Sequence, residues 1–215
     1  MGEFFHFAFF PFIPLLIVPL IAGLVIWATL VQKQRTAANL QKLAVRLGLE
    51  FLPAGGWLGR PSIVGPMRGK AVQIFNYTTG SGKSRTTWSA MKAQLAAPSQ
   101  LSFTLRKQGF ATRIIELFGA HEITVGDAEF DKAWFVQTNQ PGFMRAALIP
   151  EMRAKLMAAL HAGLPGAFEL NGRDVKYAEV GTFADAKRIE RFAALGEVLC
   201  DLADVAEVAA DQGKP

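Results

Sequence analysis

The chain begins with a long apolar stretch that sets its first residues apart from the rest. From Phe4 to Val31 no residue carries a formal charge, and His6 is the only titratable side chain. About 20 apolar residues suffice to cross the hydrocarbon core of a bilayer as a helix. The pattern therefore predicts an interfacial and transmembrane segment over residues 1–31, with its Phe-rich start at the membrane surface.

The charges that flank this stretch predict its orientation. Only Glu3 precedes it, whereas Lys33, Arg35, Lys42 and Arg46 follow it. Positive charge collects on the cytoplasmic side of membrane helices. A cleaved signal peptide would start with basic residues and end in a small-residue cleavage site, and neither pattern is present. We therefore expect a retained single-pass anchor in the cell inner membrane, with the N-terminus outside and the C-terminal domain in the cytoplasm.

The spacing of apolar residues changes to that of a globular protein after the anchor. Leu40, Leu43, Ala44 and Leu47 form one stripe of a helix over Gln32–Leu49, which Gly48 should end. Residues 32–56 are therefore predicted to be a juxtamembrane helix and loop, residues 57–210 a globular domain, and residues 211–215 a tail.

Four short runs with strand character follow, each bounded by turn residues. They lie at about Ser62–Val64, Ala71–Thr78, Arg85–Leu95 and Leu101–Arg106. Consecutive strands with short links favour antiparallel pairing of neighbours. We expect these four strands to form a meander.

The second half of the domain mixes helices and strands. The predicted helices are Thr112–Phe118, a helix from about Asn139 to Leu148, Glu151–His161 and Phe183–Ala209. The predicted strands are Glu122–Val125, Ala133–Thr138, and the hairpin of Phe168–Leu170 with Val175–Val180 around Asn171-Gly172. The predicted fold class is α+β: one transmembrane helix, then an antiparallel sheet with helices packed on one face and a long C-terminal helix. The buried stripe of that last helix should hold Ile189, Phe192, Leu199 and Leu202.

The net charge of +5 conceals an uneven distribution. Residues 32–115 hold thirteen Lys or Arg and only Glu50 as an acid, whereas residues 116–215 hold ten basic and sixteen acidic residues. A charge asymmetry of this size indicates which kinds of surface or partner the two halves bind, and it does not indicate the fold. We expect the basic half to face an anionic lipid surface and the acidic half to face the cytoplasm or a partner.

One string resembles a phosphate-binding loop. Gly80-Ser81-Gly82-Lys83-Ser84 ends like such a loop, but Tyr77 stands where the first glycine is needed and a strand pattern follows instead of a helix. We interpret it as a β-turn with a basic tip. Lys83 and Arg85, together with Lys33 and Arg35 beside the anchor, remain candidates for contact with a lipid phosphate or another anion.

Other candidate chemistry is weaker. Glu122, Asp127, Glu129 and Asp131 form an acidic cluster beside His121, but their spacing matches no metal-binding loop. We expect a solvated acidic turn in which Asp127 and Asp131 brace the backbone. The single cysteine, Cys200, is expected to be a buried thiol, and His121 is the one candidate catalytic base.

The sequence shows no catalytic, metal or cofactor motif, and it identifies no small-molecule substrate. Trp57, Tyr77 and Trp88 alternate with basic residues as in nucleic-acid-binding proteins, but aromatic residues of a meander belong more often to the core. A membrane anchor also argues against nucleic acid as a partner.

The run Gly126–Val136, the helix that contains Arg153 and Leu156, and the hairpin and C-terminal helix after it resemble a group of bacterial membrane-anchored proteins. The similarity covers about residues 60–205. It implies the same topology, and no functional residue is carried over because the group has no settled activity.

These patterns predict a membrane-anchored, non-enzymatic interaction domain that is an accessory or assembly component of a membrane protein complex. Six phenylalanines before the span exceed what an interfacial anchor needs and are candidates for contact with a membrane-protein partner: Phe4, Phe5, Phe7, Phe9, Phe10 and Phe12. Two alternatives stay open. One is a module that senses lipid or phosphate headgroups at the cytoplasmic face, and the other is a hydrolase whose site follows no known motif.

Overall fold

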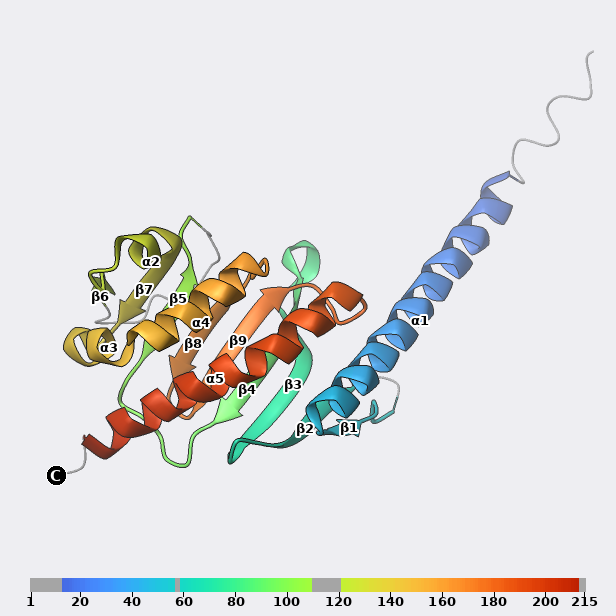
Figure 1. The fold of residues 1–215 in the computed structure, drawn as a ribbon. Coiled ribbons are helices and arrows are strands. Elements are labelled where there is room, and N and C mark those ends of the chain that lie inside the picture. The colour runs from blue at the N-terminus through green and yellow to red at the C-terminus, as the bar shows by residue number, and fades with distance from the viewer. Residues whose placement is uncertain (1–12, 57–58, 110–120, 213–215) are drawn as a thin grey trace, which may run out of the picture.

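The fold is α+β, as the sequence predicts. A computed structural model describes residues 13–56, 59–109 and 121–212, in which α-helices accompany one nine-stranded antiparallel sheet (Figure 1). The helices are α1 (Ile13–Leu47), α2 (Ala128–Ala133), α3 (Pro141–Ala147), α4 (Pro150–His161) and α5 (Ala186–Gln212). The strands are β1 (Glu50–Leu52), β2 (Ser62–Met67), β3 (Lys70–Thr79), β4 (Thr86–Gln94), β5 (Phe103–Lys107), β6 (His121–Ile123), β7 (Trp134–Thr138), β8 (Ala167–Asn171) and β9 (Asp174–Val180).

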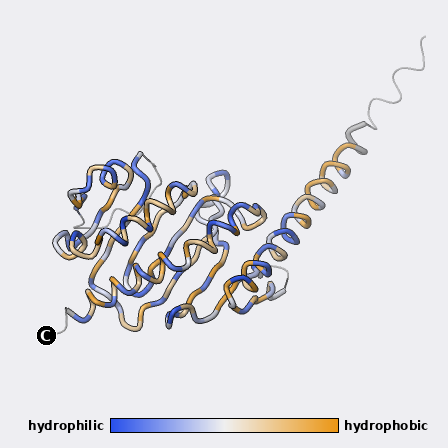
Figure 2. The backbone as a smooth tube through the Cα atoms, viewed as in Figure 1, coloured by the Kyte–Doolittle hydropathy of each residue, from blue (hydrophilic) through white to orange (hydrophobic). Residues whose placement is uncertain are grey.

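Helix α1 joins the apolar segment and the domain without a break. The predicted anchor and the predicted juxtamembrane helix form one helix that continues past Val31 and Gln32. It ends at Gly48, as expected, where a φ of +65° suits glycine. Its first half extends away from the domain and is apolar, and polar residues begin midway (Figure 2). By length and composition this is a helix that can cross a membrane, and no residue of its most apolar stretch is buried by the rest of the protein.

The sheet order is β1-β2-β3-β4-β9-β8-β5-β7-β6. The predicted meander is therefore correct for β2, β3 and β4 and wrong for the fourth strand. Strand β5 does not pair with β4, because the β8–β9 hairpin lies between them. The meander also gains β1 in a segment without strand character, where Phe51 pairs with Ile63.

The β8–β9 hairpin occurs where the sequence predicts it, with a shift of one residue in the turn. Asn171 pairs with Asp174 at the end of the ladder, so the turn residues are Gly172 and Arg173. Gly172 has a φ of +66°, a conformation that favours glycine.

Helices α4 and α5 lie side by side on one face of the sheet (Figure 1), and α5 contacts the central strands β4 and β9. The core between them and the sheet contains Ile74, Met91, Tyr177 and Phe168 from neighbouring strands. The predicted buried stripe of α5 is confirmed, with Ile189, Phe192, Leu199 and Leu202 all in this core, and so is the burial of Cys200.

The opposite face of the sheet carries no helix in the described part of the chain. Tyr77 and Trp88 are cross-strand neighbours on this face, half-buried, with ring centroids 6.3 Å apart and planes at 12°. The expectation that both belong to the core is wrong. Their position on the strands points them away from the side of Ile74 and Met91, which the helices cover.

The acidic cluster folds as a short helix rather than a plain turn. Asp127 caps α2 by accepting a hydrogen bond from the N–H of Phe130, at 3.2 Å. Asp131 accepts from the N–H groups of Val125 and Gly126, at 2.8 and 3.1 Å. The predicted bracing role of both aspartates is confirmed. Among the described residues, no group of His, Cys, Asp or Glu side chains is placed to hold a metal ion.

Some predictions fall outside the described residues. They are the helix over Thr112–Phe118, the position of Trp57, and the partner contacts of Phe4, Phe5, Phe7, Phe9, Phe10 and Phe12.

Candidate functional site at the base of the anchor

A groove of about 910 Å³ lies where α1 passes from its apolar half into the domain. One wall is the α1 segment from Ile26 to Ala37, and the other is formed by described residues on either side of positions 57–58, among them Pro53 and Arg60. Asn76 of β3, Thr87 of β4 and Thr182, which follows β9, form the floor. We call this site the anchor groove.

The α1 wall continues the helix face that enters the core. Ile26, Leu30, Lys33, Ala37 and Leu40 follow at intervals of three or four residues, which places them on one side of a helix. Leu40 is completely buried, whereas Leu30 is 53% exposed and Ile26 is 60% exposed. The upper part of this face is therefore apolar but uncovered.

Hydrogen bonds hold the floor of the anchor groove in place. The Asn76 side-chain amide donates to the carbonyl of Trp88 at 3.0 Å and to Ser89 Oγ at 2.9 Å. Ser89 Oγ donates to the carbonyl of Gly181 at 3.0 Å. Asn76, β4 and the end of β9 are thereby joined below the groove.

Arg60 brings a second cation to the groove beside Lys33. Its Nη2 donates to Thr78 Oγ1 at 2.7 Å, and its Nη1 approaches the carbonyl of Asn76 at 3.3 Å. A guanidinium has five N–H donors, so these two bonds leave donor capacity for a ligand. Sequence reasoning did not single out Arg60, because it is one of thirteen basic residues between positions 32 and 115 and only the fold brings it opposite α1.

The four predicted anion contacts fall in different places. Lys33 lines the anchor groove. Arg35 is exposed on the same helix and is not among the groove-lining residues. Lys83 and Arg85 are exposed in the connection between β3 and β4, which contains the short 3₁₀ helix Gly82–Ser84. That connection joins two antiparallel strands, so the interpretation as a hairpin tip is confirmed.

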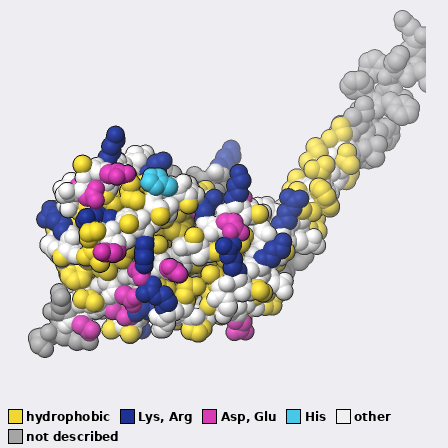
Figure 3. Space-filling model, viewed as in Figure 1, with side chains coloured by type: hydrophobic (Ala, Val, Ile, Leu, Met, Phe, Trp, Pro, Cys, Tyr) yellow, Lys and Arg dark blue, Asp and Glu magenta, His cyan; other side chains and the backbone are white. Residues whose placement is uncertain are grey.

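The hairpin tip and the apolar half of α1 lie toward the same side of the domain (Figure 1). In the space-filling view, basic side chains follow the apolar part of α1 and also gather over the β3–β4 connection (Figure 3). The tip and Lys33 are therefore both placed on the side from which the apolar helix emerges.

A buried carboxylate anchors the segment that ends at the groove floor. Glu179 on β9 has no exposed surface and is contacted by Arg188 and Arg191 of α5. Arg188 also donates to the backbone carbonyls of Thr182 and Val180. Burial and the neighbouring Glu179 carboxylate raise the pKa of Tyr177, whose hydroxyl donates to Glu179 at 2.8 Å. The hydrogen bond to Glu179 raises the pKa of Arg191.

Several basic residues of the first half form ion pairs with acidic residues of the second half. Residues Arg68 and Gly69, with φ of +49° and +79°, form the tight β2–β3 turn beneath α5. Arg68 pairs with Asp201, and Lys70 pairs with Asp204 at 3.0 Å and with Glu207. Arg46 of α1 pairs with Glu190 at 2.5 Å. The acidic second half thus binds basic residues of the first half, which leaves fewer cations for an external surface.

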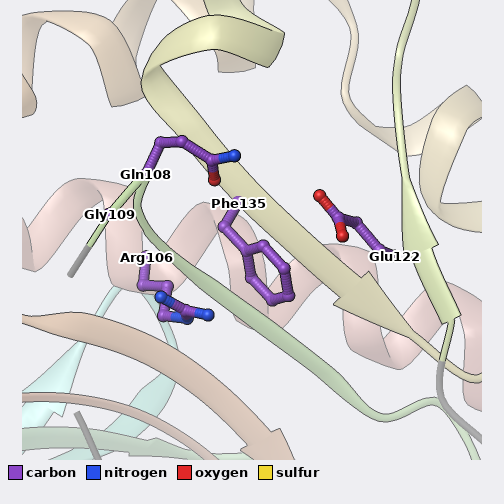
Figure 4. Close-up of a pocket in the computed structure, with 5 residues that line it drawn as sticks. All are labelled: Arg106, Gln108, Gly109, Glu122 and Phe135. Atoms are coloured by element: carbon purple, nitrogen blue, oxygen red, sulfur yellow. The ribbon is translucent and has the colours of Figure 1, made fainter. Parts of the chain in front are cut away.

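A smaller pocket of about 340 Å³ lies at the other end of the sheet (Figure 4). Glu122, Gln108 and Gly109 line it with Arg106 and Phe135, and the Arg106 guanidinium lies 4.0 Å from the centroid of the Phe135 ring. His121, the candidate base, is not among these lining residues.

Neither a protein-family model nor a curated protein sequence matches the chain. Among solved structures, the crystal structure of the mycobacterial trehalose monomycolate transport factor A, TtfA, has a similar fold. The TM-score is 0.55 and the sequence identity 13%, over 80% of this chain and 95% of that chain. At this identity the similarity establishes a shared fold.

Proposed function

We propose that this protein is a membrane-anchored, non-enzymatic accessory component of a membrane protein complex, and that the complex belongs to a transport system. The observation that carries the proposal is the unbroken helix α1. Its apolar half is exposed, and its last turns, with Leu40, Leu43 and Ala44, are buried in the domain core.

This arrangement supports a binding role because the domain is not attached through a flexible linker. A continuous helix fixes both the height and the rotation of the domain relative to the span. A domain so fixed presents its surfaces in a constant orientation to a neighbouring membrane protein. The similar fold of a protein named as a transport factor supports the choice of a transport system.

The experiment is crosslinking in native membranes, followed by mild solubilisation and native gel electrophoresis. We expect a heteromeric complex that is lost when residues 1–12 are deleted and Ile13 onward is kept. Another variant keeps the segment hydrophobic but removes its aromatic rings, by replacing Phe4, Phe5, Phe7, Phe9, Phe10 and Phe12 with leucine. It should insert normally and also lose the complex, which would show that the rings and not hydrophobicity alone are needed. A protein that runs as a monomer in several gentle detergents, without crosslinks in membranes, would exclude the proposal.

A second variant tests the role of the unbroken helix. Insertion of two residues after Val31 rotates the domain by about 200° around the helix axis relative to the span. We expect membrane insertion to remain and the complex to be lost. An undiminished complex would show that the orientation set by α1 is irrelevant to assembly.

A second candidate function is headgroup sensing by the hairpin tip, and one observation favours it. Lys83 and Arg85 are exposed in the hairpin tip, and this tip lies on the side of the domain from which the apolar half of α1 emerges (Figure 1). A basic residue near an anionic surface contributes about 1 kcal/mol, an effect that salt screens. In liposome sedimentation, the chain from Gln32 onward should lose anionic-lipid binding on substitution of Lys83 and Arg85 by Gln. Lys42→Gln, an exposed cation farther along α1, is the control and should have little effect.

A further inference from the structure

The anchor groove has an apolar end and a cationic end. At the apolar end, Ile26 and Leu30 belong to the last two turns of the uncharged segment. At the other end are Lys33, the first basic residue after that segment, and Arg60 from the opposite wall. Ile26 and Lys33 are seven residues apart, which on a helix is about 10 Å.

The lining of the groove is complementary to an anion. No carboxylate is present among the described residues that line it, whereas two cations and several neutral hydrogen-bonding side chains are, including Gln32, Asn76 and Thr182. Two carboxylates near the groove are paired with other cations: Glu179 binds Arg188 and Arg191, and Glu190 binds Arg46.

We propose that the anchor groove binds one anionic phospholipid from the adjacent membrane leaflet. Its acyl chain lies against Ile26 and Leu30, and its phosphate lies between Lys33 and Arg60. The proposal rests on the anchoring of α1 that the proposed function assumes, and it goes further by naming a ligand class and a site.

The position of the groove favours a lipid over a soluble anion. A free phosphate uses only the cationic end and leaves Ile26 and Leu30 without a partner, although the groove continues along them. A volume of about 910 Å³ is also far larger than one phosphate needs, and falls within the range of about 300–1,000 Å³ typical of small-molecule sites. Arg60 suits a phosphate because its planar guanidinium can donate two parallel hydrogen bonds.

The first experiment is native mass spectrometry of the full-length protein in mild detergent. Phosphatidylglycerol and phosphatidylcholine with the same acyl chains are added at equal concentrations. We expect one retained phosphatidylglycerol per protein, preferred about tenfold over phosphatidylcholine, which is the scale of one charge-assisted hydrogen bond. Lys33→Gln and Arg60→Gln should each remove that preference. Lys42→Gln is the matched control on α1 and should retain it.

A second variant keeps the proposal testable if Arg60→Gln impairs folding. Thr29 is exposed and lines the groove, so Thr29→Trp should fill the apolar end and reduce retention of phosphatidylglycerol without lowering the melting temperature. Equal retention of both lipids by the native protein would overturn the proposal, because it would indicate unspecific lipid around the anchor. Displacement of the lipid by millimolar glycerol phosphate would also overturn it, in favour of a soluble anion.

A photoreactive amino acid at Leu30 then identifies the occupant in native membranes. A lipid adduct supports the proposal, and an adduct with a protein overturns it in favour of a partner helix.

The same membranes test the proposed function separately. If the heteromeric complex forms but no selective lipid is bound, only the lipid site fails, whereas extraction of the protein by alkaline carbonate would refute the anchoring itself.

Discussion

The buried carboxylate of Glu179 accepts a hydrogen bond from Arg191 Nη2 at 2.6 Å. Glu179 belongs to β9 and Arg191 to α5, so this contact fastens the long C-terminal helix to the centre of the sheet. Arg188 completes the cluster and extends it to the carbonyl of Thr182 at the floor of the anchor groove. The stability of the domain and the shape of the candidate site therefore depend on the same residues.

Replacement of Glu179 by glutamine should lower the free energy of unfolding by about 3 kcal/mol, because it leaves buried guanidinium charge without a counter-ion. Chemical unfolding followed by tryptophan fluorescence measures this loss. Glu169→Gln is the control, since Glu169 forms a part-exposed pair with Lys176 at 3.0 Å and should cost about 1 kcal/mol or less. Equal losses in the two variants would contradict the assigned role of the cluster.

The last turns of α1 should behave as core. Leu40→Ala is expected to lower the free energy of unfolding by about 2–5 kcal/mol, since it opens a cavity at a completely buried position. Val45, on the same helix, is 79% exposed, and Val45→Ala should change stability by about 0.5 kcal/mol or less. If the two substitutions had the same effect, α1 would not be packed against the domain as the structure shows.

A dependence of stability on pH is expected at Glu207. Hydrogen bonds from the Lys70 side chain and from the N–H of Ala96 lower its pKa from the ordinary value of 4.5. The unfolded chain then takes up a proton at higher pH than the folded chain. The contribution is fully present above about pH 4.5 and is lost as the pH falls through the lower, folded pKa.

Glu207→Gln should therefore be less stable than the native protein by about 1 kcal/mol at pH 7, and the difference should shrink toward zero below pH 4.5. Urea unfolding at a series of pH values measures it. Glu197→Gln removes an exposed carboxylate from the same helix and controls for the change in net charge. A difference that stayed constant across the acid range would rule out this linkage.

The orientation of the anchor is testable with fusions at the C-terminus. The four basic residues Lys33, Arg35, Lys42 and Arg46 after the span, with none before it, predict a cytoplasmic domain. An alkaline phosphatase fusion should be inactive, and a fluorescent protein fusion should be bright. Replacement of Lys33 and Arg35 by glutamine, with basic residues added before Phe4, should shift the balance toward the opposite orientation. An active phosphatase on the native chain would place the domain outside the cytoplasm.

The sequence alone determined the features that depend on local periodicity. The uncharged stretch to Val31, the stripe that includes Leu40 and Leu43, and the alternation in β2, β3 and β4 predicted their elements, because each needs only contacts within a few residues or one buried face. The helix cap at Asp127, the bracing of the loop by Asp131 and the end of α1 at Gly48 were also predictable. They are hydrogen bonds and dihedral angles of short segments.

The tertiary structure decided everything that joins distant segments. No local pattern indicates that the β8–β9 hairpin inserts between β4 and β5, since the pairing of Met91 with Tyr177 depends on the packing of the whole sheet. The same holds for the pairing of Lys70 with Glu207 and for Arg60 opposite Lys33, which lie far apart in the chain. Sequence showed that the two halves carry opposite charge excesses. Only the fold decided which of those charges neutralise each other and which lie beside the anchor. Electrostatic interaction depends on distance and burial in space and not on separation along the chain.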